Sequence, residues 1–429
     1  MKAKNSSFVE NLLQSGSLIL IAALFAIGVM IALAAGIPVA SVMENYSYNV
    51  LVILIIMELF TSLIVECGIM QFIAVKIATF SQGKKRLCLM LFGGMMFLIS
   101  ACLNNITSVL IILPVILVLF KTLDIDKHYI SVFFASILAL CNLGGMGSPI
   151  GDFPALLIMT SGITSFLAYL THAFPLALIT ALVLLAVWSM MVKQENGPDA
   201  MRSYAVLNLK SQYKFTKVRF DVLKWLGGIF VGMFLAWSFV PQNIIPPEII
   251  AILGYVAAMV VCGVKGVKVK QHMDMKSVLT IGSFLFFAEV ISQTGILVAL
   301  ANFLQANIDN PKLLVMVIMV ITSLVAGLFS AGPAAAAMMP VIVQLCNGPL
   351  SAQSDWIAVA YAAAICAGSS LFLWSATAGF ILAGKVTDAE LEETSGARIP
   401  WGIPQYMKYG FINYAIQLGI ALIVIACVL

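Results

Sequence analysis

The sequence predicts an all-α polytopic membrane protein made of two inverted repeats, with about 9 to 11 spans, two re-entrant hairpins and two broken helices. Of 429 residues, 62% are hydrophobic and only 10% are charged, against about 25% charged residues in a soluble protein. Residues 17–36, 48–65, 163–192 and 411–429 form apolar runs that reach or approach the roughly 20 residues of a bilayer-spanning helix. The ten-residue alternation of a membrane β-barrel does not occur in the sequence, so the spans are expected to be helical.

Basic residues gather in three loops, and their placement predicts the orientation of the chain. The clusters lie within residues 84–86, 193–224 and 265–276. Because cytoplasmic loops carry an excess of Lys and Arg, all three are predicted to lie inside, together with Lys2 and Lys4. No clear small-residue cleavage site follows the first apolar run, so we interpret it as a retained membrane helix. These observations predict a multi-pass protein of the cell inner membrane, in contact with lipid, with a cytoplasmic N-terminus.

The chain divides at its longest central hydrophilic segment, residues 193–222, which we predict to be a cytoplasmic linker. It separates a first transmembrane repeat, residues 1–192, from a second, residues 223–429. Three segments match in the same order at offsets of 225 to 227 positions: 60–69 with 287–296, 108–116 with 334–342, and 140–141 with 365–366. In the predicted orientation, helix 48–67 runs inward and helix 277–294 runs outward. The repeats are therefore predicted to be inverted, an architecture that supports alternating access.

Each repeat contains a short polar interruption between two apolar segments. In the first repeat, segments 89–103 and 109–120 flank a run that contains Asn104, Asn105, Thr107 and Ser108. Each flank has about 15 residues, fewer than a span comfortably needs. The pair is therefore predicted to form a re-entrant hairpin with its polar tip near the membrane midplane. The counterpart tip in the second repeat is residues 330–333, which begin with Ser330.

A second interruption in each repeat is rich in glycine, proline and small polar residues. Residues 142–154 contain four glycines and two prolines, which disfavour a regular helix, so we predict an unwound break inside one spanning segment. The counterpart break is residues 368–379. Free carbonyls at such breaks suit sodium, and the N–H groups of helix N-termini suit anions. The residues expected at the substrate or ion site are Asn142, Gly145, Ser148 and Asp152 in the first break and Ser369, Ser370, Ser375 and Thr377 in the second.

Asp152 is the most informative single residue, because a carboxylate near the bilayer centre costs several kcal/mol unless it is paired or hydrated. One interpretation makes it a cation or proton site, with Asn105 as a second Na⁺ ligand. The other makes it the N-cap of a helix that begins at Phe153, and both roles can hold together. The polar residues of the first hairpin likewise either line the site or cap the hairpin tip.

Other ionisable residues in apolar runs leave two interpretations open. Glu58, Glu66 and Glu289 each serve either helix packing and interface placement or ion coupling. His172 is either a packed or interfacial side chain or a proton relay. The eight cysteines form no CxxC pair, so we expect buried free thiols rather than metal or redox sites. No cofactor is expected beyond a transported or coupling Na⁺ or H⁺.

Two of these segments resemble the ion transporter superfamily, which includes arsenite permeases, citrate-type transporters, the melanosomal P protein and one group of sodium/proton antiporters. Residues 103–115 read Leu-Asn-Asn-Ile-Thr-Ser-Val-Leu-Ile-Ile-Leu-Pro-Val, and residues 142–154 read Asn-Leu-Gly-Gly-Met-Gly-Ser-Pro-Ile-Gly-Asp-Phe-Pro. The resemblance extends over most of the chain. The second segment is similar to the antiporter branch, which implies that Asp152, Asn105 and Thr107 are site residues.

The resemblance implies an ion-coupled secondary active transporter, or permease, that moves a small anionic solute across the inner membrane by alternating access. The alternative is a sodium/proton antiporter centred on Asp152. The antiporter branch usually has Asp-Asn in the first hairpin, where this chain has Asn104-Asn105, and the second tip lacks the usual Asn or Asp. The loss of these carboxylates weakens a two-aspartate antiport mechanism.

An enzyme is not expected. Intramembrane aspartyl proteases use Gly-x-Gly-Asp, whereas residues 149–152 read Pro-Ile-Gly-Asp. The sequence contains neither a His-Glu-x-x-His metalloprotease motif nor a P-loop. The expected partners are membrane lipid and a small inorganic or organic ion. The resemblance adds a homodimer as a further expectation, and no nucleic acid partner is expected.

Overall fold

The computed structural model describes residues 21–429 except 193–198, 215–216, 268–274, 349 and 394–395. All regular elements in this part of the chain are helices, apart from one isolated bridge between Glu392 and Arg398. After a helix at Ile21–Ala34, the elements are α2 (Val39–Glu44), α3 (Tyr48–Glu66), α4 (Ile69–Ser81), α5 (Lys85–Ser100), α6 (Asn105–Phe120), α7 (Lys127–Met146), α8 (Phe153–Ser161), α9 (Phe166–Met191), α10 (Asp199–Gln212), α11 (Phe220–Phe239), α12 (Pro247–Val264), α13 (Met275–Gln293), α14 (Ile296–Asn307), α15 (Pro311–Phe329), α16 (Ala331–Asn347), a short 3-10 turn (Ser351–Gln353), α17 (Ser354–Ser369), α18 (Gly379–Asp388) and α19 (Ile403–Val428).

The described helices confirm a polytopic α-helical membrane protein. Seven of them, α3, α7, α9, α11, α12, α15 and α19, are long and apolar enough to cross a membrane. The number rises to nine if each of two bent pairs, α13 with α14 and α16 with α17, counts as one span. Nine is the lower end of the predicted range. The two helices of the first predicted hairpin, α5 and α6, have only 16 residues each, which is short for a complete span.

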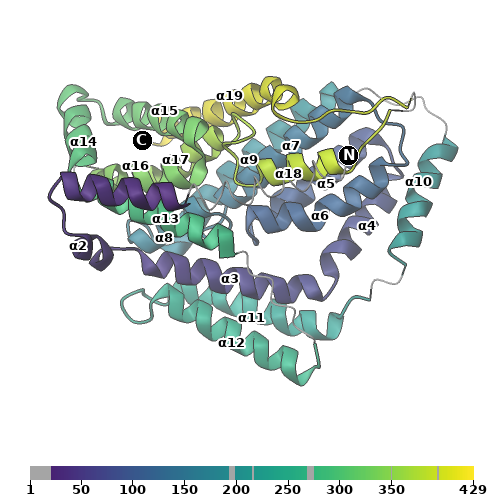
Figure 1. Cartoon of the computed structure of the whole chain (residues 1–429), viewed down its shortest axis with the longest axis horizontal. Coiled ribbons are helices and arrows are strands. Elements are labelled where there is room, and N and C mark those ends of the chain that lie inside the picture. The colour runs from purple at the N-terminus through teal and green to yellow at the C-terminus, as the bar shows by residue number, and fades with distance from the viewer. Residues whose placement is uncertain (1–20, 193–198, 215–216, 268–274, 349, 394–395) are drawn as a thin grey trace.

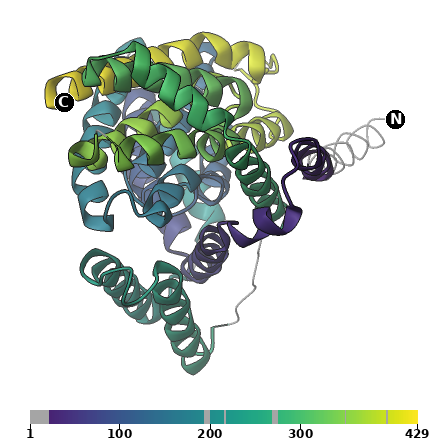
Figure 2. The ribbon, with the colours of Figure 1, turned by 90° about the vertical axis from the view of Figure 1, so that its left-hand side faces the viewer.

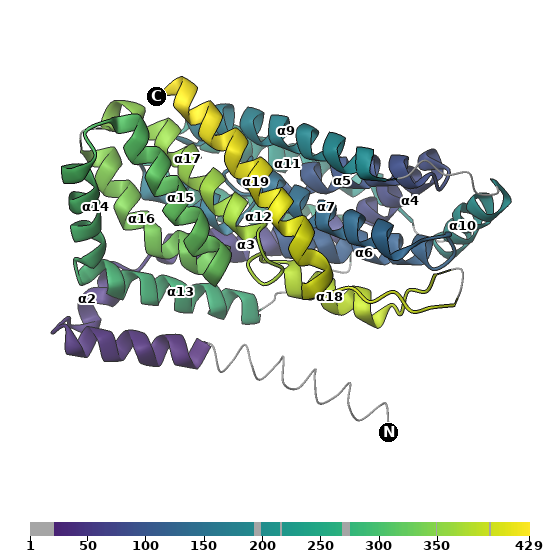
Figure 3. The same ribbon diagram turned by 90° about the horizontal axis from the view of Figure 1, so that it is seen from above.

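Most long helices run along the long axis of the molecule (Figure 1). The helix of the basic central segment, α10, and the helix that follows the predicted outward span, α14, lie at opposite ends of this axis (Figures 1 and 3). Seen along the axis, α11 and α12 form a hairpin at one side of the bundle (Figure 2), where α12 packs on α3. The long axis is therefore the direction in which we expect the chain to cross the bilayer.

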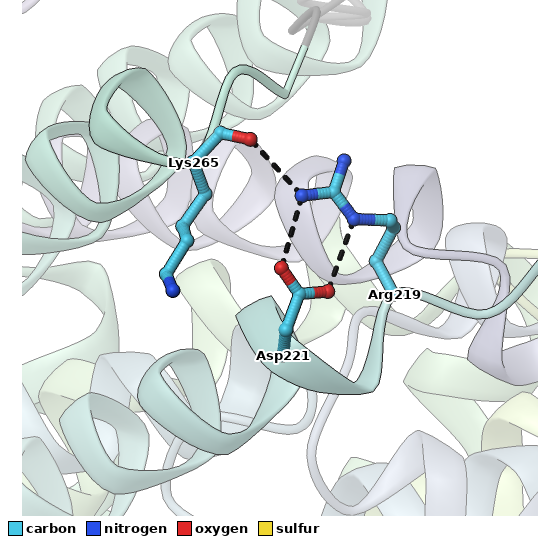
Figure 4. A network of polar contacts seen from close by, with 3 residues as sticks. All are labelled: Arg219, Asp221 and Lys265. Atoms are coloured by element: carbon cyan, nitrogen blue, oxygen red, sulfur yellow. Dashed lines mark hydrogen bonds and ion pairs between the residues drawn. The ribbon is translucent and has the colours of Figure 1, made fainter.

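The predicted linker contains regular structure. Helix α10 occupies much of it, and α11 begins at Phe220, before the predicted end of the linker. Arg219, just before α11, donates to Asp221 at 3.0 and 3.1 Å and to the carbonyl oxygen of Lys265 at 3.0 Å (Figure 4). Its backbone N–H also donates to the carbonyl oxygen of Cys67 at 3.1 Å. These contacts fasten the end of the linker to α12 and to the turn between α3 and α4.

Helix boundaries in the two halves fall at matching positions. The turn between α3 and α4 is at Gly68 and that between α13 and α14 is at Gly295, and both glycines have φ of 74°. This left-handed conformation is easy only for glycine. Pro114 lies inside α6 and Pro340 inside α16, at the predicted equivalent positions. The limits of the two repeats and their opposite orientation in the membrane, including Lys2 and Lys4 outside the described residues, stay predictions.

The predicted interruptions are shorter in the structure than in the sequence analysis. Helix α7 continues to Met146, so the first break covers only residues 147–152 rather than 142–154. The first hairpin tip ends at Asn104, because α6 already begins at Asn105. The second tip is a single residue, Ser330, with φ of 105°. The predicted tip of residues 330–333 was therefore too long. Helix α16 already begins at Ala331, and Gly332 and Pro333 lie in its first turn, where proline is tolerated.

Close helix packing explains why glycines persist inside regular helix at the breaks. A Cβ atom at Gly144 of α7 would collide with the carbonyl oxygen of Phe97 in α5. A Cβ atom at Gly368 of α17 would likewise collide with the carbonyl oxygen of Ser323 in α15. Gly144 therefore allows α7, which leads into the first break, to pack closely on α5 of the first hairpin. Gly368 does the same for α17 and α15 in the second half. This close packing positions the site.

Candidate functional site

The first hairpin and the first break meet at a hydrogen bond between two predicted site residues. Asn105 Nδ2, in the first turn of α6, donates to Asp152 Oδ2 at 2.9 Å. The other carboxylate oxygen, Asp152 Oδ1, accepts the backbone N–H of Phe153 at 2.9 Å. Asp152 is therefore the N-cap of α8, as one interpretation of the sequence predicts, and its second oxygen is held by the hairpin.

A buried serine and a cysteine carbonyl support this pair. The hydroxyl of Ser100, at the end of α5, lies within hydrogen-bond distance of Asn105 Oδ1 and 2.7 Å from the carbonyl oxygen of Cys141. With its oxygen facing a hydroxyl donor, the Asn105 amide is oriented so that its nitrogen faces Asp152. Asn105 and Ser100 are fully buried. Sequence reasoning missed Ser100, whose only signal is a hydroxyl at the end of an apolar segment beside the polar tip.

Two glycines of the break leave the space that this contact needs. A Cβ atom at Gly145 would lie 2.8 Å from Asn105 Oδ1 and 2.8 Å from Asp152 Cβ. A Cβ atom at Gly151 would lie 2.8 Å from the carbonyl oxygens of Gly145 and Ser100. Gly145 was predicted as a site residue, and the structure places it directly against the Asn105–Asp152 pair.

Asp152 faces a small cavity between the break and α3. The cavity has a volume of about 30 Å³, more than the roughly 10–15 Å³ that one water requires. Its polar and ionisable lining residues are Glu58, Thr61, Cys102, Asn104 and Asp152, and the remaining lining residues are Ile53, Leu54, Met57, Ile150, Gly151, Phe153 and Leu156. None of them is Lys, Arg or His. Two acidic residues from distant parts of the chain thus line one small cavity with room for a water or a small cation.

The second break contacts the first across the two halves. Asn142 Nδ2 donates to Ser370 Oγ at 3.0 Å, and Ser370 Oγ donates to the carbonyl oxygen of Cys366 at 3.1 Å. All three residues are buried. The structure therefore brings together one predicted site residue from each half: Asn142 in the last two turns of α7 and Ser370 at the end of α17.

Ser375 organises the second break. Its hydroxyl accepts the backbone N–H of Phe372 at 3.0 Å and lies 3.1 Å from the carbonyl oxygen of Ser369. Its own carbonyl oxygen accepts the backbone N–H of Ala331 at 3.1 Å. The residue that follows the second hairpin tip, Ala331, is thus hydrogen-bonded to the second break. In the first half, Asn105 makes the corresponding bond between the first tip and the first break.

Tyrosines hold the carbonyl ends of both broken helices. Tyr169 of α9 donates to the carbonyl oxygen of Met146 at 2.7 Å, and Tyr406 of α19 donates to the carbonyl oxygen of Ser370 at 2.8 Å. Both tyrosines are buried. Because the last carbonyls of a helix have no partner within the helix, these hydroxyls satisfy groups that would otherwise be exposed at membrane depth.

The other predicted residues have local roles. Asn104 caps α6 by accepting the N–H of Ile106 at 2.8 Å, while Ser108 Oγ donates back to the carbonyl oxygen of Asn104 at 3.0 Å. Ser148 is buried within the first break, and Thr107 and Thr377 are half-buried. None of Thr107, Ser108, Ser148 and Thr377 lines the Asp152 cavity.

The remaining ionisable candidates separate by location. Glu66 is exposed at the end of α3. Glu58 of the same helix lines the small cavity together with Asp152, and Glu289 lines a second, larger cavity. His172 packs edge-to-face on Trp356 with ring centroids 4.6 Å apart, as expected of a packed histidine. All eight cysteines are free thiols, and those outside the hydrophobic interior are Cys102 and Cys427.

A bundle of apolar helices, interrupted by two breaks that carry buried polar contacts, is the architecture of a polytopic membrane transporter. Comparison with known protein families gives a more specific assignment. The sequence profile described as citrate transporter matches residues 14–366, and the chain belongs to this family. The predicted resemblance to the ion transporter superfamily is thereby confirmed.

Individual relatives agree with a transport role. The chain is 23% identical over 385 residues to an uncharacterized transporter of Mycobacterium bovis, across 88% of this chain and 85% of the relative. It is 25% identical over 402 residues to magnetosome protein MamN of Magnetospirillum gryphiswaldense, across 89% and 87% of the two chains. A match of 109 residues at 31% identity links 25% of the chain to 22% of the sodium/proton antiporter NhaD of Alkalimonas amylolytica. The named activities among these relatives are transport rather than enzymatic ones.

Proposed function

We propose that the protein is a cation-coupled secondary transporter of the inner membrane, with its N-terminus in the cytoplasm and its coupling Na⁺ or H⁺ bound at Asp152. The observation that carries the proposal is the Asp152 carboxylate, held between hairpin and break and facing a cavity that Glu58 also lines. An ionised carboxylate at this depth is costly without a partner. In the part of the chain that the structure describes, no basic residue lines the cavity, so a bound cation is the natural counter-charge.

The two carboxylates link cation binding to movement. Glu58 belongs to α3, whereas Asp152 belongs to the break that the hairpin holds through Asn105. Two ionised carboxylates repel each other across a cavity, and a cation or proton between them removes that repulsion. Occupancy of the site therefore favours an arrangement in which α3 and the break lie close together, and departure of the cation favours their separation.

The proposed solute is a small anion that moves together with the cation. The description of the matching family as citrate transporters supports an anionic solute. Because no basic side chain lines the cavity, the anion depends on the bound cation and on the N-terminal ends of α6 and α8, where helix N–H groups favour negative charge. Both helices begin beside Asp152 or Asn105.

Sodium/proton antiport is the second candidate. The pair of carboxylates at one cavity favours it, because sodium and protons can compete for the same oxygens. The partial match to a sodium/proton antiporter supports it as well. In this case no organic solute moves, and Asp152 alternates between a protonated and a sodium-bound form.

Proteoliposomes that contain the purified protein and a pH-sensitive dye separate the two candidates. Sodium, lithium or potassium is added outside, with and without citrate, succinate, arsenite or sulfate. Uptake of one solute that requires a cation gradient supports the first candidate. Proton movement driven by a cation without any solute supports the second. Absence of both responses, with protein that remains monodisperse, contradicts both.

A further inference from the structure

A second, much larger cavity lies on another side of α8 from the Asp152 cavity. Its volume is about 500 Å³, within the range of roughly 300–1,000 Å³ typical of small-molecule sites. It is lined by α8, α13, α14 and α16 and by the chain at the start of α3. The cavity therefore lies between elements of both halves of the chain.

The lining is rich in hydrogen-bond acceptors and contains one charge. Among the described residues that line the cavity, Glu289 carries the only charge, and none is Lys, Arg or His. The other polar lining residues are Ser47, Asn49, Thr160, Ser161, Ser292 and Gln344. A single carboxylate inside a pocket that lacks a counter-charge in its described lining concentrates a negative potential there. Such a pocket attracts cations and disfavours free anions.

Glu289 is held in place by a chain of hydrogen bonds. Gln293, one turn further along α13, donates from Nε2 to Glu289 Oε1 at 2.8 Å. Gln293 is held in turn by Ser41 of α2, whose hydroxyl donates to Gln293 Oε1 at 3.2 Å. A carboxylate that is fixed by neighbours in this way presents a defined set of oxygens to a ligand.

Gln344 on α16 lines the same cavity, and its amide is held by a neighbouring side chain. Its Nε2 donates to Asn302 Oδ1 at 2.6 Å, which fixes the orientation of the amide. Its Oε1 is then buried with no hydrogen-bond partner among the described residues. A buried acceptor without a partner is costly, but an oxygen with almost no accessible surface is closed to a ligand in the cavity.

From these observations we propose that the cavity is a binding site for a small cation, either a metal ion or an organic ammonium, held by the Glu289 carboxylate. This site is separate from the one at Asp152. Helix α8 lines both cavities through adjacent residues, Leu156 in the small cavity and Leu157 in the large one. This arrangement suits an entry station, where a cation binds before it reaches Asp152.

The test measures the chemistry of the cavity with charged thiol reagents. Ser292 lines the cavity one turn from Glu289, so Ser292→Cys is introduced with the exposed Cys102 and Cys427 changed to serine. Rates of modification by a cationic and an anionic methanethiosulfonate are each divided by the rate with a free thiol in solution. Thr160→Cys, on α8 and also in the lining of the cavity, serves as a second reporter if Ser292→Cys does not fold.

We expect the cationic reagent to react at least about 10-fold faster than the anionic one, since focused potentials change encounter rates by about 10- to 1,000-fold. Glu289→Gln should abolish this preference, whereas Glu289→Asp and the matched control Glu66→Gln should retain it. Millimolar Na⁺, Mg²⁺ or methylammonium should protect the cysteine, and the protecting ion distinguishes a metal site from an ammonium site.

The proposal is overturned by equal rates, by a faster anionic reagent, or by a charge preference without protection by any of the cations. The result is independent of the proposed coupling site. Asp152→Asn should leave both preference and protection unchanged. If Asp152→Asn also transports normally, the proposed function fails while the entry site stands. Loss of protection in Asp152→Asn would show one site rather than two and would overturn the proposal.

Discussion

The amide of Asn105 donates to Asp152 Oδ2 at 2.9 Å across 47 positions of the chain. This bond joins the tip of the first hairpin to the start of α8. Asn105 also faces the hydroxyl of Ser100, so its orientation is fixed from both sides. A movement of the hairpin therefore moves the Asp152 carboxylate with it, which is the linkage that a coupled transporter needs.

Asn105→Ala should raise the sodium concentration for half-maximal transport by about 10- to 100-fold. A hydrogen bond to a charged group contributes about 1.5–3 kcal/mol, and the variant leaves Asp152 Oδ2 without its donor. The measurement is initial transport rate against sodium concentration in proteoliposomes. Asn307→Ala is the control, because Asn307 is exposed and bonds only within α14. Equal sodium dependence in Asn105→Ala and the unmodified protein would contradict the assigned role.

Gly145→Ala should reduce transport at least about 10-fold, because the new methyl group would lie 2.8 Å from Asn105 Oδ1 and from Asp152 Cβ. The pair has to separate, or α7 has to shift. Gly94→Ala on α5 is the matched control, since nothing lies within 4 Å of its added methyl group. Transport rates of the two variants, normalised to the amount of protein, make the comparison. Normal transport in Gly145→Ala would show that this contact is not needed.

Glu58→Gln should alter coupling more than folding. The variant keeps the shape of the side chain and removes one of two carboxylates that line the Asp152 cavity. We expect at least about a 10-fold loss of apparent cation affinity, or a change in the charge moved per solute. Transport currents on a solid-supported membrane measure both quantities. Glu66→Gln, at an exposed position of the same helix, should behave like the unmodified protein, and a similar effect of the two variants would count against the site.

Asn142 and Ser370 should show a measurable coupling energy, because they join α7 of the first half to the end of α17 in the second half through a 3.0 Å hydrogen bond. Double-mutant cycles of polar contacts inside membranes average about 0.6 kcal/mol and reach about 1.7 kcal/mol. The free energy of unfolding in mixed micelles is measured for Asn142→Ala, Ser370→Ala and the double variant. Strictly additive effects would mean that the contact does not join the halves energetically.

Much of the fold is predictable from the sequence because bilayer crossing imposes a strong composition and length requirement. The approximate positions of the breaks follow from glycine, proline and small polar residues, and the N-cap role of Asp152 follows from its place before a proline-containing helix. The limits of the breaks were less predictable. Gly144 and Gly145 have low helix propensity, yet both lie in regular helix. The structure gives another reason for glycine there: a side chain at either position would collide with neighbouring backbone or side-chain atoms.

The partners of Asp152 were only partly predictable. Asn105 could be named because it belongs to a polar run, but Ser100 lies outside that run and reaches the site only through the packing of α5 against α7. Glu58, Glu66 and Glu289 look alike in sequence, since each is an acidic residue in or near an apolar helix. Only the three-dimensional arrangement assigns Glu58 to the small cavity and Glu289 to the large one.

The most direct test of the central claim compares two aspartates that both cap a helix. Asp152 caps α8 and Asp126 caps α7, and because asparagine is also a good N-cap, Asp→Asn should preserve folding at both positions. Cation-driven transport is measured for both variants in the same proteoliposomes. We expect Asp152→Asn to abolish cation dependence while Asp126→Asn retains it. Full cation-dependent transport in a folded Asp152→Asn protein would contradict the assignment of the coupling site.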